Sequence, residues 1–214
     1  ALYTEACQIV VRADSEIQTV EDLQDKRVSV GEEESGTEQN AKQILAAYGL
    51  NDTIVDEVNL DYSNAAEELK EGKIDAFFCT AGAQTTVIGE LAKKCDIRFL
   101  NIDESGAEKL KKTYKFYTDC TIPKDTYNGQ TEDVQTVGVK AVLLASDKLS
   151  ADTVKDITKI LFKNKQELQY ALPVDIALDE KTAVEGVTIP FHKGAAQYYE
   201  ECGMDAAELT TEKG

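Results

Sequence analysis

The chain has 214 residues, is 42% hydrophobic and 29% charged, and carries a formal net charge of −17 at pH 7. This length and composition predict a globular protein of one or two domains. The negative charge argues against nucleic acid and against an anionic membrane surface as partners, because their phosphates would be repelled. No apolar run approaches the ~20 residues needed to span a bilayer, and residues 1–12 lack the basic start and apolar stretch of a signal peptide.

The cysteines and the single histidine argue against a metal site and against catalysis. The five cysteines, at positions 7, 79, 95, 120 and 202, show no C-x-x-C spacing, and an odd number cannot pair completely. His192 alone supplies neither a histidine-based metal site nor a Ser-His-Asp triad. No phosphate-binding loop, dinucleotide motif or nucleophile elbow is present. We therefore expect no metal, no cofactor and no enzymatic activity.

Strands and helices alternate through the first half of the chain. The clearest helix carries Ala41, Ile44, Leu45 and Tyr48 at the spacing of one buried face. In chain order the pattern predicts a strand at 7–13, a short helix or turn at 19–26, a strand at 27–31, a helix at 35–48, a strand at 53–60, a helix at 63–69, a strand at 73–82, a helix at 85–94 and a strand at 97–102. Such alternation favours an α/β fold with a parallel sheet and helices on its faces.

The pattern changes after Tyr114. Residues 114–130 are rich in aromatic and turn-forming residues and read as a long connection. A long strand is expected at 135–146, followed by a helix that Ser150 caps and that carries Val154, Ile157 and Leu161 on one face. Helical segments are expected from there to Gly203.

The first candidate binding site is the strand–turn–helix around Ser35, Gly36 and Thr37. A helix N-terminus offers free backbone N–H groups and a partial positive charge to an anion. The two hydroxyl groups add donors, and the glycine allows close approach to the backbone. The alternative is a plain capping box, in which Ser35 and Glu38 serve only the helix.

The second candidate is the segment that follows the strand at 73–82, namely Gly82, Ala83, Gln84 and Thr85. In open α/β sheets, ligands bind beyond the carboxyl ends of the strands, and both candidates lie at such ends. Gln84 and Thr85 can donate hydrogen bonds at the start of the next helix. The alternative is a short connecting turn without a ligand. The segment 125–130 similarly reads as a surface turn with an exposed aromatic, Tyr127.

Four groups of short motifs occur in order along the chain: LYTE, DLQDKRVSVG and SGT within residues 1–50, IDAFFCTAGAQT at 74–85, IPKDTYNGQ at 122–130, and IPFHKGAAQYYEECG at 189–203. Together they resemble the TAXI family, the extracytoplasmic solute receptors of TRAP-type transporters. Gln84 and Asn128 stand where that family usually has proline. The family's opening glycine-rich strand–helix–strand region has no counterpart here.

The resemblance implies a type II periplasmic-binding-protein fold, with two α/β domains and a ligand cleft between them. Residues 28–120 would form the second domain, and 1–27 with 121–214 part of an incomplete first domain. It implies a monomer outside the cytoplasm, periplasmic or lipid-anchored, that delivers a small carboxylate or amino acid such as glutamate to a TRAP permease. The expected ligand-binding residues are Ser35, Gly36, Thr37, Gly82, Ala83, Gln84 and Thr85, with Tyr3 from the first motif and Tyr127 from the third.

Three other functions are compatible with such a fold. One is the substrate-binding protein of an ABC importer, of the type that takes up a thiamine precursor. Another is an enzyme, against which the missing catalytic residues count. The third is the effector domain of a regulator, which requires a DNA-binding helix-turn-helix elsewhere in the protein.

The charge run Glu32, Glu33 and Glu34 bears on the class of ligand, because it precedes the proposed anion site. If these side chains face the site, they repel a dianion at a cost of about 4 kcal/mol per contact at ~4 Å and an effective dielectric near 20. A zwitterion avoids most of this cost, which favours an amino acid over a dicarboxylate. If instead they point to solvent, salt screens them and the preference disappears.

Overall fold

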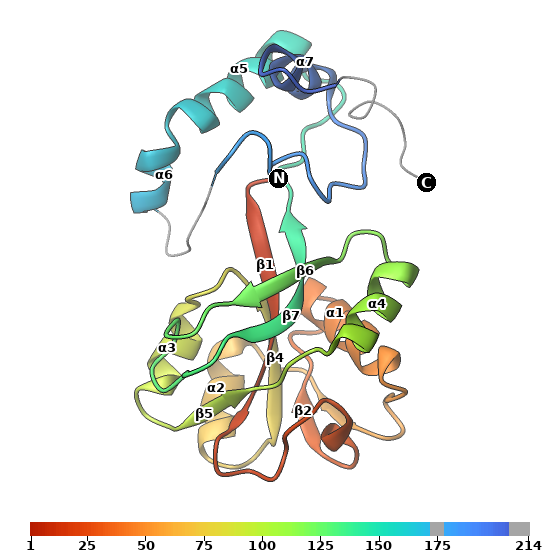
Figure 1. Cartoon of the computed structure of the whole chain (residues 1–214), viewed down its shortest axis with the longest axis vertical. Helices are drawn as coiled ribbons and strands as arrows, with labels where there is room; N and C mark the ends of the chain where they lie inside the picture. Colours follow the sequence, from red (N-terminus) through yellow and green to blue (C-terminus); the bar gives the residue numbers. More distant parts are fainter. Residues whose placement is uncertain (172–177, 206–214) are drawn as a thin grey trace. The chain divides into compact units, whose positions relative to one another are not determined.

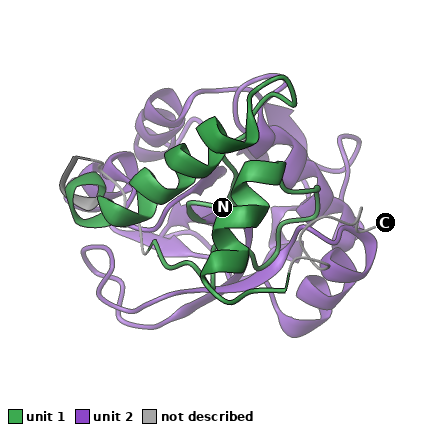
Figure 2. Cartoon of the chain, turned by 90° about the horizontal axis from the view of Figure 1, so that it is seen from above, with its two compact units in different colours: residues 1–3, 140–214 green, residues 4–139 purple. Residues whose placement is uncertain are grey.

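The computed structural model describes residues 1–171 and 178–205. It divides into two compact units (Figure 2), one formed by residues 4–139 and the other by residues 1–3 with 140–214. These boundaries differ from the expected ones at 27/28 and 120/121. The reason is that the strand before the first expected boundary, at 3–12, and the strand after the second, at 134–141, belong to the same sheet as the strands within residues 28–120. The helical character expected across 172–177 lies outside the described residues.

The larger unit is built on one mixed sheet (Figure 1). Its strands are β1 (Tyr3–Arg12), β2 (Arg27–Ser29), β3 (Asp56–Val58), β4 (Ala76–Ala81), β5 (Ile97–Phe99), β6 (Thr118–Ile122) and β7 (Val134–Ala141). They lie in the order β3-β2-β4-β1-β7-β6, and β5 also pairs with β1. The α/β class is therefore confirmed.

The expectation of a parallel sheet holds for only part of it. β2 pairs in parallel with β3 and with β4, because helices connect these strands and return the chain to the same end of the sheet. β1 runs antiparallel to β4 and β5, and β6 runs antiparallel to β7. The long connection at 114–130 thus contains β6, which the sequence pattern did not reveal.

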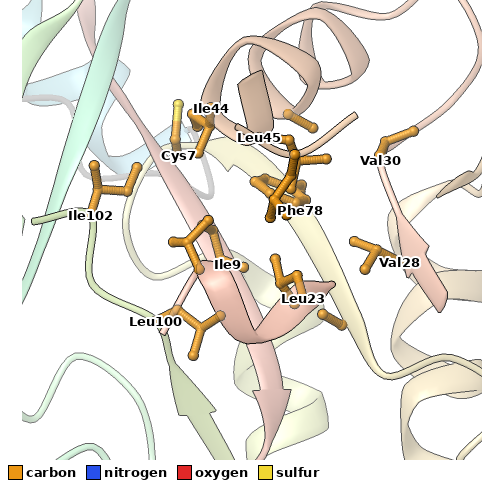
Figure 3. Close-up of a cluster of buried hydrophobic side chains, with 14 of the residues drawn as sticks. Cys7, Ile9, Leu23, Val28, Val30, Ile44, Leu45, Phe78, Leu100 and Ile102 are labelled. Carbon is orange, nitrogen blue, oxygen red and sulfur yellow. The ribbon is translucent and has the colours of Figure 1, made fainter. Parts of the chain in front are cut away.

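Helices cover both faces of this sheet. On one face, α1 (Gly36–Ala47) and α4 (Glu104–Thr113) contribute to one apolar core with Cys7, Ile9 and Val11 of β1. Figure 3 shows Cys7 and Ile9 of β1 with Ile44 and Leu45 of α1 in this core. On the other, α2 (Tyr62–Lys70) and α3 (Thr86–Ala92) pack on Ala6 and Val10. The alternating side chains of β1 therefore supply two apolar cores, one on each face of the sheet.

Helix boundaries follow from their caps. α1 begins after Ser35, as expected, because the Ser35 hydroxyl accepts a hydrogen bond from the Glu38 N–H. α2 begins at Tyr62, one residue before the expected start at 63, because Asp61 is its cap and accepts from the N–H groups of Ser63 and Asn64. α4, which was not expected, begins after the cap Asp103. A short 3-10 helix, Glu21–Leu23, occupies the stretch expected as helix or turn.

The smaller unit contains α5 (Ala151–Lys163), α6 (Lys165–Ala171) and α7 (Lys193–Glu201). Ser150 caps α5 as expected. The strand expected at 135–146 ends at Ala141, because residues 142–146 have no strand partner among the described residues. No helix in the described residues is long and apolar enough to cross a membrane.

α5 and α7 approach each other closely at Gly194. A Cβ atom placed there would collide with the carbonyl oxygen of Ala151 and lie 2.7 Å from the backbone nitrogen of Lys155. Both are backbone atoms of α5, so they cannot rotate away as the end of a side chain can.

Replacing Gly194 by alanine is therefore expected to destabilise the smaller unit by about 1–3 kcal/mol, the usual cost of overpacking. Gly89→Ala is the matched control. Gly89 lies in α3, and a Cβ atom placed there would have no neighbouring atom within 4 Å, so alanine there should gain about 0.5–1 kcal/mol of helix propensity. Chemical denaturation of both variants measures the difference, and equal stabilities would contradict the close approach.

Candidate functional site

The segment after β2 forms a tight turn into α1. Gly31 adopts a φ of +102°, and a Cβ atom there would lie 2.9 Å from the Cβ of Thr37. Ser35 accepts from the Glu38 N–H at 3.1 Å, while the Glu38 carboxylate accepts from the Glu34 N–H at 2.7 Å. The capping box weighed in the sequence is therefore present in its Ser35 half, while the Glu38 carboxylate accepts from Glu34, the residue before the cap, and not from the cap residue itself.

The capping box leaves part of the helix terminus free. The backbone N–H groups of Gly36 and Thr37 have no hydrogen-bond partner in the described part of the chain, as is usual in the first turn of a helix. The Ser35 hydroxyl accepts one bond and keeps its own proton to donate. Glu32, Glu33 and Glu34 are all exposed, which matches the solvated alternative for this charge run.

The hydrogen bonding of Thr37 differs from the expectation that its hydroxyl donates to a ligand. Its Oγ1 lies 2.6 Å from the Tyr62 hydroxyl, which lies 3.0 Å from the Thr80 carbonyl oxygen. A carbonyl can only accept, so Tyr62 donates to Thr80 and Thr37 must donate to Tyr62. Burial raises the pKa of Tyr62 to about 12, which keeps its proton in place at neutral pH. Thr37 is thus left with lone pairs only.

The second candidate segment is held by a closed hydrogen-bond network. Tyr127 donates to the Gln8 side-chain oxygen at 2.7 Å and accepts from the Thr85 N–H at 3.0 Å. The Gln8 amide nitrogen donates to the Thr85 hydroxyl at 3.1 Å, and that hydroxyl donates to the Gly82 carbonyl at 2.8 Å. Both donors of Thr85 are therefore occupied, contrary to the expectation that it donates to a ligand.

Tyr127 is buried rather than exposed, with 5% of its surface accessible. It stacks on Phe99 at 5.1 Å between ring centroids, and burial raises the pKa of its hydroxyl. In this structure Tyr127 anchors the segment 82–85 by accepting the hydrogen bond from the Thr85 N–H. Gln84 is the exposed member of that segment and adopts a φ of +65°.

The structure brings the two candidate segments together. β2 and β4 are adjacent and parallel, so the residues that follow them lie at one edge of the sheet, where Tyr62 connects Thr37 to Thr80. Tyr3 belongs to the smaller unit, where it packs against an apolar cluster.

Sequence patterns missed three residues that shape this region. They are Gln8, Asn59 and Tyr62. Gln8 carries a visible signal, since it is a polar residue inside the otherwise apolar run of residues 6–11, and it is 1% exposed. Asn59 donates to the Gly31 carbonyl and to the Glu38 carboxylate. Neither Asn59 nor Tyr62 shows a local pattern that would have singled it out.

Glu38 is the charged residue that ties this region together. Its side chain is buried and bonds Lys42 at 2.8 Å, the Glu34 N–H and Asn59. The Lys42 ammonium, followed by the Glu34 N–H, holds the pKa of the Glu38 carboxyl below its usual range. Among the described residues, no group of three or more histidine, cysteine, aspartate or glutamate side chains could hold a metal ion.

Comparison with known proteins identifies a family. Residues 1–203 match the family described as the NMT1-like family. Similar solved structures include the periplasmic aliphatic sulphonate binding protein SsuA from Escherichia coli, with 14% identity and a TM-score of 0.49 over 97% of this chain and 53% of that chain. The substrate binding protein of an amino acid ABC transporter aligns with 22% identity and a TM-score of 0.43 over 81% and 60%.

A third similar structure is the holo form of ArgBP from T. maritima, with 21% identity and a TM-score of 0.40 over 77% of this chain and 55% of that chain. The chain thus spans between 53% and 60% of the length of these three proteins.

The lowered pKa of Glu38 makes a prediction about acid stability. A carboxyl group whose pKa falls on folding stabilises the protein above its unfolded pKa of about 4.3, and this contribution is lost as the pH falls through the folded value. Glu38→Gln should therefore flatten the loss of stability between about pH 5 and pH 3. Melting temperatures across this range measure it. Lys42→Met, which removes the paired ammonium, should flatten the same limb, and wild-type-like acid profiles for both variants would contradict the assignment.

Proposed function

The chain belongs to the NMT1-like family, and from this premise we propose that it is part or all of an extracytoplasmic solute-binding protein. It captures a small carboxylate or amino acid for import across a membrane and catalyses no reaction. The observation that carries the proposal is the meeting of two ligand-binding candidates at one sheet edge, where Tyr62 links Thr37 to Thr80. Ligands of open α/β sheets bind at such edges.

The free groups at this edge suggest how a ligand is held. The N–H groups of Gly36 and Thr37 and the Ser35 hydroxyl can donate to a carboxylate, assisted by the helix dipole. Thr37 offers lone pairs only, so the group that meets its hydroxyl is a donor, such as an ammonium. A zwitterionic amino acid supplies both. Glu32, Glu33 and Glu34 are exposed, so their charges give no reason to prefer an amino acid over a dicarboxylate. The preference for an amino acid rests instead on the Thr37 hydroxyl, which can only accept a hydrogen bond.

Two classes of importer are candidates for the partner permease. One is an ABC importer, because the match to the NMT1-like family leaves the class of permease open. A TRAP permease is supported by the series of TAXI-like motifs, from SGT at 35–37 to IPFHKGAAQYYEECG at 189–203. Cross-linking the protein to its membrane partner and identifying the captured subunit distinguishes them, since only an ABC importer contains an ATP-binding cassette.

A ligand screen tests the proposed function. Glutamate, glutamine and arginine are compared with succinate, 2-oxoglutarate and ethanesulfonate by calorimetry and thermal unfolding. We expect an amino acid to bind and to leave unchanged, with a stabilisation of about 2.7 kcal/mol at a hundred times its dissociation constant. Chemical turnover of the ligand would overturn the binding-protein assignment, and tighter binding of the dicarboxylates would overturn the preference for a zwitterion.

The hydrogen bonds from Thr37 to Tyr62 and from Tyr62 to Thr80 lead to a prediction about single substitutions. Thr37→Val keeps the branched shape but removes the lone pairs, so amino-acid affinity should fall roughly ten-fold, as for the loss of one hydrogen bond to a charged group. Tyr62→Phe frees the Thr37 proton for donation, so the ratio of amino-acid to dicarboxylate affinity should fall. Thr53→Val is the control, because among the described residues the Thr53 hydroxyl bonds only Asn51. Equal affinities in all four proteins would exclude Thr37 from the site.

A further inference from the structure

Glu5 lies on β1 at the point where this strand leaves the core of the larger unit. Residues 6–11 of β1 are buried, whereas Glu5 is half-buried. Ala6 pairs with Ala81 of β4 in antiparallel register, so the preceding residue of β1, Glu5, lies opposite Gly82. Gly82 opens the second candidate segment for ligand binding. The strand register therefore places a carboxylate at the sheet edge where the two candidate segments meet.

The side chain of Glu5 lies on the face of the sheet that α1 covers. Side chains alternate along a strand, so Glu5 shares its face with Cys7 and Ile9, which belong to the core that includes α1. Thr80 of β4 is beside Cys7 on this face, and its hydroxyl donates to the Cys7 sulfur at 3.7 Å. Glu5 is one step closer to the edge than this pair. It is therefore on the same side of the sheet, and at the same edge, as the start of α1.

The negative charge of Glu5 acts on the Tyr62 hydroxyl, which accepts the hydrogen bond from Thr37. Burial is the main reason that the pKa of Tyr62 is raised to about 12, and the charge of Glu5 adds to the rise. Burial and, after it, the charge of Glu5 also raise the pKa of the Cys79 thiol to about 12. Both shifts have the sign that a nearby negative charge produces. The Glu5 carboxylate is therefore within electrostatic reach of the hydroxyl that holds Thr37.

A half-buried carboxylate at this edge distinguishes between the two classes of ligand. The Ser35 hydroxyl and the N–H groups of Gly36 and Thr37 can hold one carboxylate of a ligand. A second carboxylate next to Glu5 would be repelled, and salt screens a partly buried charge less than an exposed one. An ammonium would be attracted to Glu5, and it would also find the lone pairs of the Thr37 hydroxyl.

We propose that Glu5 selects an amino acid over the corresponding acid without the amino group, by pairing with the ligand's ammonium while the start of α1 holds its carboxylate. This pairing rests on the proposed function and adds to it a specificity-determining residue. It also gives the ligand an orientation, with its ammonium toward β1 and its carboxylate toward α1.

The test compares ligands that differ only in the amino group. Calorimetry measures glutamate against glutarate, glutamine against glutaramate, and arginine against δ-guanidinovalerate. The proteins are the wild type, Glu5→Gln and the control Glu16→Gln. Glu16 is exposed and follows the other end of β1, so its replacement removes the same charge far along the strand from the candidate site.

We expect the wild type to prefer the amino acid of the pair that it binds. In Glu5→Gln this ratio of affinities should fall at least ten-fold, as for the loss of one hydrogen bond between charged groups. In Glu16→Gln it should stay the same. Glu5→Asp keeps the charge and should retain most of the ratio. A general loosening of the site weakens both members of a pair, so the ratio reports the ammonium alone.

Failure of this pairing and failure of the proposed function give different results. If the wild type binds an amino acid and Glu5→Gln keeps its full preference over the acid without the amino group, the pairing is wrong and the binding function stands. An equal loss of affinity for both members of a pair shows that Glu5 only supports the structure, which also overturns the pairing. If the wild type binds none of the compounds, the proposed function fails, and the pairing fails with it.

Discussion

Burial of β1 on both faces is the constraint on which the larger unit depends. Cys7, Ile9 and Val11 point into the core beneath α1 and α4, while Ala6 and Val10 point into the core beneath α2 and α3. A strand that supplies both cores must lie in the interior of the sheet, with a partner on each side. β4 and β7 are those partners, and the order of the remaining strands follows from them.

Gln8 is the one polar side chain among the buried residues 6–11 of β1, and it shows how the core and the candidate site are linked. A buried amide must be hydrogen-bonded or it costs free energy, on the order of 1–3 kcal/mol. Gln8 meets this demand by bonding Tyr127 and Thr85, so the polar interruption of the core becomes the support of residues 82–85. The Thr37–Tyr62–Thr80 chain does the same for the start of α1. Each network uses up some hydrogen-bond donors and acceptors and leaves others unpaired. The unpaired groups determine which chemical groups of a ligand can bind there.

Local elements with strong patterns were predictable. The helix expected at 35–48 forms with its cap at Ser35 and its apolar face at Ala41, Ile44 and Leu45, because capping and 3.6-residue periodicity act within a few residues. α4 was missed, although Asp103 caps it, because its ten residues contain only two buried apolar side chains, Ala107 and Leu110. The strand expected at 135–146 stops at Ala141, since strand formation needs a partner and apolar residues alone do not supply one.

By itself, the sequence determined the α/β class, the position of most helices and the two segments that meet at the sheet edge, because these depend on periodicity, caps and turns. Only the tertiary structure decided the antiparallel pairing of β1, the unit boundaries and the burial of Tyr127. It also decided which hydroxyl protons remain free, since Thr37 meets Tyr62 across 25 residues and Tyr127 meets Gln8 across 119. Such contacts join residues far apart in the chain, and their geometry is set by the packing of the whole sheet rather than by any local pattern.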